Sequence, residues 1–107
     1  MSEILEKLCD SATEAHARIQ ENYADLNPVV GVSQKMREAG IPVDAMTIDC
    51  LRSNKRIIIL LHDLEPEIMR YQFSFKDQDP NEHFETISTQ EINATTLYKL
   101  IENYLAN

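Results

Sequence analysis

Glycine is scarce in this chain, which has only Gly31 and Gly40 among its 107 residues. Phosphate-binding loops use glycines to bring several backbone N–H groups close to a phosphate. The chain therefore has no glycine-rich nucleotide-binding loop. Arg52, Lys55 and Arg56 are clustered, but without glycines or a helix N-terminus beside them we expect no anion site there.

Cysteine is equally rare, because Cys9 and Cys50 are the only two and stand 41 residues apart. That spacing is neither a Cys-x-x-Cys motif nor a zinc-ligand pair. His16 follows Cys9 by seven residues on one predicted helix, but two ligands do not form a metal site. The sequence predicts a reduced, cytoplasmic protein that holds no metal and no cofactor.

Long apolar runs are also missing. The longest stretch without Asp, Glu, Lys or Arg is 26–34, whereas a membrane helix needs about 20 apolar residues. The first residues are Met1, Ser2 and Glu3, where a secretory signal would need a basic residue. We expect no signal peptide and no membrane association.

Basic residues are too few to balance the acidic ones, and the net charge is −8. Residues 1–40 and 77–107 hold four and one basic side chains against seven and six acidic ones, whereas 41–76 is neutral. An acidic surface repels phosphate backbones, so we expect no nucleic-acid binding. A basic protein partner remains compatible with this charge, as does a purely solubilising role.

The apolar pattern predicts helices at both ends of the chain. Apolar residues recur at three- and four-residue steps over 3–24, which indicates a long amphipathic helix. Asn27-Pro28 and Gly40 are typical of a helix start and stop, so a second helix is predicted over 28–39. A closing helix is predicted to begin after Ser88 or after Asn93 and to run nearly to the C-terminus.

Four strands are predicted between these helices. The uncharged run 57–62 is typical of a central strand that is buried on both faces, with neighbours at 46–51 and 68–76 and a fourth strand at 83–88. The expected partners are Cys50 with Ile57, Ile48 with Ile59, Met46 with Leu61, Leu61 with Met69, Ile59 with Tyr71, Ile57 with Phe73, and Phe75 with Phe84. The predicted fold is α+β: two N-terminal helices, a four-stranded antiparallel meander and a C-terminal helix packed on the sheet, in a single domain of residues 1–107.

Two patterns that resemble chemical sites do not complete one. Cys50 and His62 are a thiol and an imidazole, but the expected hairpin places them about 16 Å apart, so no catalytic dyad is predicted. Asp77, Asp79 and Asn81 match the first ligand positions of a calcium loop. The loop's required glycine and closing glutamate are absent, so no calcium site is expected.

The sequence favours a noncatalytic function. We expect a small acidic interaction or regulatory module, chaperone-like or inhibitor-like, that binds a protein partner or a second copy as a homodimer. The predicted contact surface is a mixed apolar and polar sheet face, which helix 3–24 could instead cover: Leu51, Ile58, Leu60, Arg70, Gln72 and Ile87. The alternative is a small-molecule-binding module or an enzyme, with its site at the strand end near His62, Asp63 and Glu65.

Overall fold

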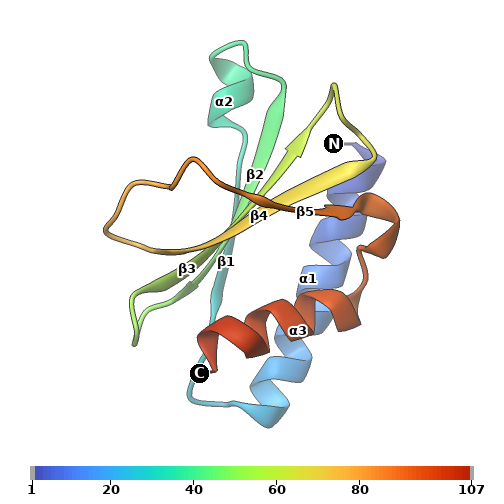
Figure 1. The fold of residues 1–107 in the computed structure, drawn as a ribbon. Coiled ribbons are helices and arrows are strands. Elements are labelled where there is room, and N and C mark those ends of the chain that lie inside the picture. Colours follow the sequence, from blue (N-terminus) through green and yellow to red (C-terminus); the bar gives the residue numbers. More distant parts are fainter. Residues whose placement is uncertain (1, 107) are drawn as a thin grey trace.

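The computed structural model describes residues 2–106, in which a five-stranded antiparallel sheet carries its two long helices on one face (Figure 1). The elements are, in chain order, α1 (Glu3–Asn22), β1 (Val29–Ser33), α2 (Lys35–Glu38), β2 (Val43–Cys50), β3 (Lys55–His62), β4 (Ile68–Phe75), β5 (Glu85–Ser88), the 3-10 turn η1 (Thr89–Glu91) and α3 (Ala94–Leu105). The α+β class, the antiparallel sheet and the C-terminal helix are confirmed.

The sheet is a meander in which each strand pairs with the next, in the order β1-β2-β3-β4-β5. The run predicted to be central is indeed the middle strand, β3. Ile57 and Ile59 are fully buried, and Ile58 on the other face is only 8% exposed. The run of branched aliphatic residues thus forms the middle strand, where both faces are buried, as its hydrophobicity requires.

The segment predicted as the helix 28–39 is instead mostly strand, and that prediction was wrong. Val29–Ser33 forms β1 and pairs with β2, while only Lys35–Glu38 makes a helical turn. The physical reason is that Val29, Val30 and Val32 are β-branched residues, which favour a pleated strand over a helix. The sheet consequently has five strands rather than four.

The register is confirmed on one side of β3 and corrected on the other. Between β3 and β4 the pairs are Ile57 with Phe73, Ile59 with Tyr71 and Leu61 with Met69, as predicted. Between β2 and β3 the pairs are Cys50 with Lys55, Ile48 with Ile57, Met46 with Ile59 and Asp44 with Leu61, two residues from the expected register. A shift of two residues leaves every side chain on its predicted face, because strand side chains alternate with a period of two.

The segment that leads into the C-terminal helix also differs from the prediction. β5 pairs only with Ile68–Tyr71, so Phe75 has Lys55 on β3 as its partner and does not pair with Phe84. Of the two predicted helix starts, Asn93 is the N-cap of α3, since its side chain accepts a hydrogen bond from the Thr96 N–H. Ser88 caps η1 instead.

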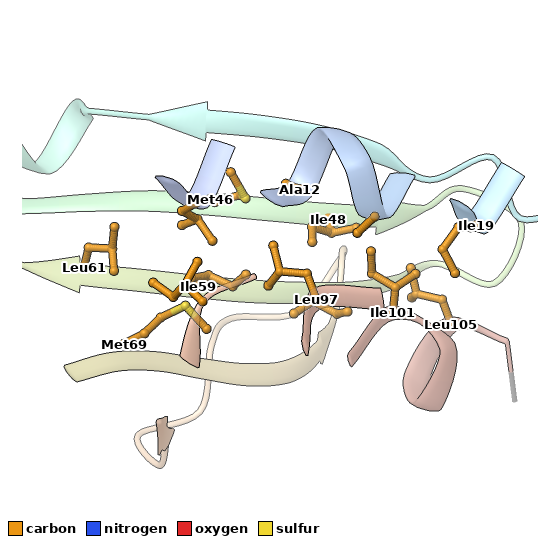
Figure 2. Packing of buried hydrophobic residues seen from close by; sticks show 14 of the residues in the cluster. Ala12, Ile19, Met46, Ile48, Ile59, Leu61, Met69, Leu97, Ile101 and Leu105 are labelled. Atoms are coloured by element: carbon orange, nitrogen blue, oxygen red, sulfur yellow. The ribbon is translucent and has the colours of Figure 1, made fainter. Parts of the chain in front are cut away.

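The core lies between α1, α3 and the inner face of the sheet (Figure 2). The predicted apolar stripe of α1, whose residues recur at three- and four-residue steps, is buried: Leu5, Leu8, Ala12, Ala15 and Ile19. Leu97, Ile101 and Leu105 of α3 pack onto the same cluster. Helix α1 therefore covers the inner face, not the opposite face that it had been expected to cover as one possibility. Within residues 2–106, no helix is both long enough and apolar enough to cross a membrane.

Candidate functional site

The outer face of the sheet, opposite α1 and α3, is the main surface without a helix over it (Figure 1). It is defined here by the residues that alternate with the core positions along the three long strands. They are Val43, Ala45, Thr47 and Asp49 of β2, Arg56, Ile58, Leu60 and His62 of β3, and Ile68, Arg70, Gln72 and Ser74 of β4. Aliphatic side chains thus form the middle of this face.

Four of the six predicted contact residues lie together on the outer face. Ile58 stands opposite Gln72, and Leu60 stands opposite Arg70. Leu51 lies in the turn after β2 and is 63% exposed. Ile87 lies opposite Met69 and packs against the core cluster, so its predicted location on this face was wrong. The predicted register of β5 was the source of that error.

Ion pairs fix the charged side chains of the outer face. Arg56 donates from Nε to Asp49 Oδ1 at 2.7 Å and from Nη2 to Asp49 Oδ2 at 2.9 Å, across the β2–β3 pair. This hydrogen bonding raises the pKa of Arg56. Arg70 donates to Glu65 Oε1 at 2.8 Å. Each cation on this face therefore has an anion beside it, and the face carries no net charge from these four residues.

Gln72 is predominantly structural. It is 4% exposed, and its Nε2 donates to the backbone oxygens of Asn81 and His83 at 3.0 and 2.8 Å. Its Oε1 accepts from the Asn81 N–H at 2.8 Å. One buried amide thus holds the 76–84 loop against β4, which shapes one margin of the outer face.

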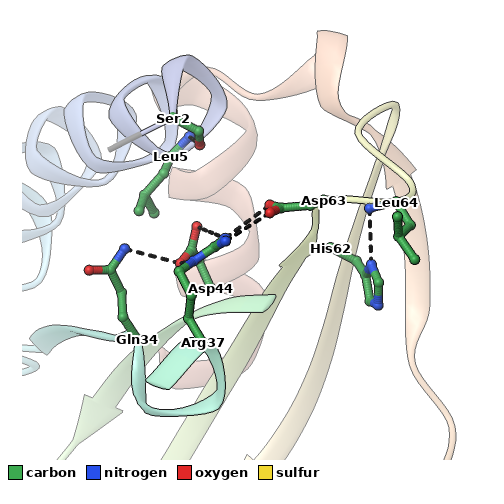
Figure 3. A network of polar contacts seen from close by, with 8 residues as sticks. All are labelled: Ser2, Leu5, Gln34, Arg37, Asp44, His62, Asp63 and Leu64. Atoms are coloured by element: carbon green, nitrogen blue, oxygen red, sulfur yellow. Dashed lines mark hydrogen bonds and ion pairs between the residues drawn. The ribbon is translucent and has the colours of Figure 1, made fainter. Parts of the chain in front are cut away.

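A polar network occupies the end of the sheet near the N-terminus of α1 (Figure 3). Arg37 donates to both carboxylate oxygens of Asp44 at 3.0 Å and to both oxygens of Asp63 at 2.7 and 2.9 Å. Gln34 adds a hydrogen bond to Asp44 at 3.1 Å. Such fork-shaped pairing is the strongest geometry that arginine offers to carboxylates. The network ties α2 to β2 and to the end of β3.

The hydrogen bonds from Arg37 lower the pKa of both Asp44 and Asp63. Of the two, the Asp44 side chain is nearly sealed from solvent at 4% exposure, whereas that of Asp63 is 47% exposed. Asp44 therefore stays ionised because it is paired, not because water reaches it. Both carboxylates are held as stable anions, which is unsuited to a general acid at neutral pH.

The alternative site at the strand end is not assembled as a catalytic group. Asp63 is held by Arg37, Glu65 is held by Arg70, and His62 Nδ1 accepts from the backbone N–H of Leu64 at 3.1 Å. A hollow of about 140 Å³ lies beside them. It is smaller than the roughly 300 Å³ at which small-molecule sites begin.

Cys50 and His62 lie at opposite ends of the β2–β3 pair. Cys50 pairs with Lys55 next to the hairpin turn, whereas His62 pairs with Val43 at the far end of the same two strands. Both Cys9 and Cys50 are free thiols. Across residues 2–106 no three side chains of His, Cys, Asp or Glu are placed to share a metal ion.

Sequence reasoning missed two features. Arg37 had been assigned to an ordinary helix, so its network was not anticipated. The exposed edge strand β1 was missed for the same reason, although the composition Val-Val-Gly-Val at 29–32 was a usable signal. No protein-family model, curated protein or solved structure matches the chain.

Proposed function

We propose that the protein is a noncatalytic interaction module that associates with a second copy of itself through the outer face of the sheet. The observation that carries this proposal is that α1 and α3 pack on the same face, which leaves Ala45, Leu60 and Ile68 partly exposed as an apolar strip on the other face. Ion-paired side chains border that strip. An apolar centre with a polar rim is the usual composition of a protein interface.

The centre of the interface is Leu60, with the partly exposed Ala45 and Ile68 beside it; Ile58 is already buried within the chain. Leu60 is half-buried between its neighbours and lies on the middle strand, so a partner would cover it fully. Full burial of a leucine side chain contributes about 1.5–3 kcal/mol relative to full exposure, and only part of that remains to be gained here. Leu60 is thus the position where substitution tests the interface most directly.

Charge favours a second copy over an acidic or a basic partner. The chain carries −8 overall, yet on the outer face Arg56 is neutralised by Asp49, and Arg70 is neutralised by Glu65 of the β3–β4 turn. Two such faces can meet about a two-fold axis without net repulsion, as an isologous dimer requires. Two copies of the acidic helical side of the molecule would repel each other in such an arrangement.

The area of the outer face sets the expected strength of association. Strand spacing and rise give a flat area of roughly 500 Å² for the three long strands and their flanks. Standard stable complexes bury about 800 Å² per partner. The expected dimer is therefore reversible and depends on protein concentration.

Sedimentation velocity of the wild type between about 10 and 500 µM tests the proposal. The average sedimentation coefficient of a reversible dimer rises across that range, because the dimer fraction grows with concentration. Leu60→Lys should remain monomeric throughout, since a lysine opposite a second lysine across the two-fold axis must be buried unpaired. Leu64→Lys is the matched control, because Leu64 is 78% exposed in the β3–β4 turn. A wild type that is monomeric at the highest concentration, or a folded Leu60→Lys variant that still dimerises, contradicts the proposal.

The alternative of a small-molecule site near His62, Asp63 and Glu65 has less support, because each of these side chains is bound to a separate partner. Its test is independent of dimerisation. Asp63→Asn and Glu65→Gln variants that lose binding of a copurifying small molecule, while keeping the wild-type fold, would favour it over the interaction module.

A further inference from the structure

The free edge of β1 is a second unusual surface of this protein. β1 is the first strand of the sheet, and in the described part of the chain it has a hydrogen-bonding partner only on its β2 side. In an antiparallel ladder, alternate residues direct their N–H and C=O groups away from the partner strand. Within residues 2–106, no other strand and no side chain hydrogen-bonds to the outward groups of 29–33. Part of this backbone is therefore available to another strand.

The composition of β1 leaves this edge unprotected. The strand reads Val-Val-Gly-Val-Ser, with no charge and no proline, and Val29 and Val32 are 48% and 46% exposed. Proteins normally blunt a sheet edge with lysine, proline, a bulge or a covering segment. The other edge strand, β5, has only four residues, and a very short edge strand offers little backbone for pairing. An edge left flat and apolar is a site where an added strand can pair.

A hollow runs beside this edge on its helical side. Ala12, Thr13 and His16 of α1 and Val30 of β1 line about 270 Å³ of open space. The helix is held in place there, because His16 Nε2 donates to the Pro28 carbonyl at 2.7 Å. A strand added to β1 would direct alternate side chains toward α1, as every strand in the sheet does. The hollow has room for such a side chain but is below the usual volume of a small-molecule site.

The side of α1 that borders this hollow is acidic. Helical geometry places Glu6 and Asp10 beside Cys9 and Thr13, on the solvent side of the groove. Both acids are exposed and neither takes part in an ion pair within the described chain, whereas Glu14 is paired with Arg18. An extended segment with basic side chains on its helix-facing side would therefore meet opposite charge.

We infer that the β1 edge and the adjoining face of α1 form a binding site for an extended basic segment of a partner protein, which pairs with β1 as a sixth strand. Backbone hydrogen bonds to 29–33 would supply affinity. The hollow at Thr13 and the acids Glu6 and Asp10 would select a segment whose helix-facing residues are basic, because the aliphatic stem of a lysine fits the hollow while its ammonium group reaches the carboxylates. This site is separate from the outer face and remains open whether or not the protein dimerises there.

A second copy is a poorer occupant of this edge. Pairing β1 with β1 about a two-fold axis would set two α1 helices side by side on the same face of the joined sheet. Their facing and solvent-side positions carry Glu3, Glu6, Asp10 and Glu21, with no basic residue among them. Like charges in such proximity oppose association.

The test uses a labelled probe peptide of alternating lysine and valine, seven residues long, with the intact protein. Fluorescence anisotropy should show saturable binding, and amide chemical shifts should change at Val29–Ser33 and along the Thr13 side of α1. Methylation of alternate backbone nitrogens of the peptide should abolish binding, because it removes strand pairing but keeps the charge. A glutamate-valine peptide of equal length should not bind.

Two variants locate the site, each with a matched control. Thr13→Arg, at an exposed helix position, should weaken binding by at least about tenfold through steric and charge conflict. Gln90→Arg adds the same charge at an exposed position of η1, away from β1, and is its matched control. The pair Glu6→Gln and Asp10→Asn should weaken binding about three- to tenfold, and Asp79→Asn with Glu82→Gln in the 76–84 loop should have a smaller effect.

The proposal is overturned if the peptide does not bind, if Thr13→Arg binds it as tightly as the wild type does, or if the shifted amides lie on another surface. It is also overturned if the wild type self-associates and the Thr13→Arg variant does not, since the occupant of the edge would then be a second copy. Dimerisation through the outer face is measured separately with Leu60→Lys. The proposal for the β1 edge and the proposal for the outer face can therefore be confirmed or contradicted independently.

Discussion

At the scale of single residues, Asp44 shows how a buried charge is tolerated in this chain. Its carboxylate lies at an inner-face position opposite Leu61, where sequence alternation alone would suggest an apolar residue. Arg37 and Gln34 supply three hydrogen bonds to it. A buried charge without such partners would be strongly destabilising. Asp44 is therefore tolerated because α2 brings Arg37 to it.

This pairing makes stability depend on pH in a defined direction. Because the pKa of folded Asp44 is lowered, the unfolded chain binds its proton first as the pH falls. The stabilisation is complete above the ordinary carboxyl pKa of about 4 and is lost as the pH falls through the lower folded value. We expect Asp44→Asn to be less stable than the wild type at neutral pH.

The difference in free energy of unfolding between Asp44→Asn and the wild type should shrink as the pH is lowered from about 6 to 2. Urea denaturation at a series of pH values measures it. Asp79→Asn, in the exposed loop, is the control and should show little difference at any pH. A constant difference for Asp44→Asn would show that the ionised carboxylate is not the stabilising species.

Cys50 is expected to be structural. It is 1% exposed and packs in the core, with its thiol 3.9 Å from the Leu26 carbonyl oxygen. Cys50→Ala should lower the free energy of unfolding by about 1 kcal/mol, because it leaves a small cavity. Dimerisation and peptide binding by the folded variant should be unchanged. Loss of either activity in a folded Cys50→Ala protein would assign the thiol a functional role.

At the scale of elements, the start of α3 shows which of two predicted helix starts is used. Ser88 with Glu91 has the spacing of a capping box, and Asn93 precedes the helical run. Only Asn93 caps the long helix, because Ser88 still belongs to β5 and Ile92 is inserted into the core. Tertiary packing of Ile92 thus decided between two locally acceptable caps.

The Ser88 cap of η1 and the Asn93 cap of α3 should contribute differently to the free energy of unfolding. Asn93→Ala should cost about 1 kcal/mol, the usual loss for an N-cap, because the Thr96 N–H loses its acceptor. Ser88→Ala should cost less, since η1 is a three-residue turn. Chemical denaturation followed by circular dichroism compares them. Equal losses would mean that η1 contributes as much to the fold as the cap of α3.

At the scale of the whole molecule, the charge distribution separates the two proposed surfaces. The outer face is neutral because its cations and anions are paired within the chain. The α1 side of the β1 edge is acidic and its nearest carboxylates are unpaired within residues 2–106. Salt screens interactions between exposed charges far more than it affects apolar burial.

Salt should therefore affect the two surfaces differently. Raising NaCl from about 50 to about 500 mM should weaken binding of the basic peptide several-fold. The dimer dissociation constant should change much less. Anisotropy and sedimentation in the same two buffers provide the comparison. Dimerisation that is as sensitive to salt as peptide binding would mean that intermolecular charge pairs, not Leu60 and its apolar neighbours, hold the dimer.

The sequence by itself determined the features that depend on local periodicity. The stripe from Leu5 to Ile19 defined α1, and the run at 57–62 defined the central strand, because burial of apolar side chains requires one face of a helix or both faces of a middle strand. The pairing of β3 with β4 followed from the alternation in both strands. Leu60 and Ile58 were likewise placed on the correct face, since a period of two tolerates a register shift of two.

Only the tertiary structure decided the features that depend on long-range partners. Val29–Ser33 lay between a plausible helix start and a strong helix stop, and pairing with β2 selected the strand instead. Ile87 changed face because β5 pairs it with Met69, a register that differs from the predicted one by an odd number of residues. The network of Arg37 joins residues up to 26 positions apart. Local patterns carry no information about such contacts, because their free energy is gained only when distant segments meet.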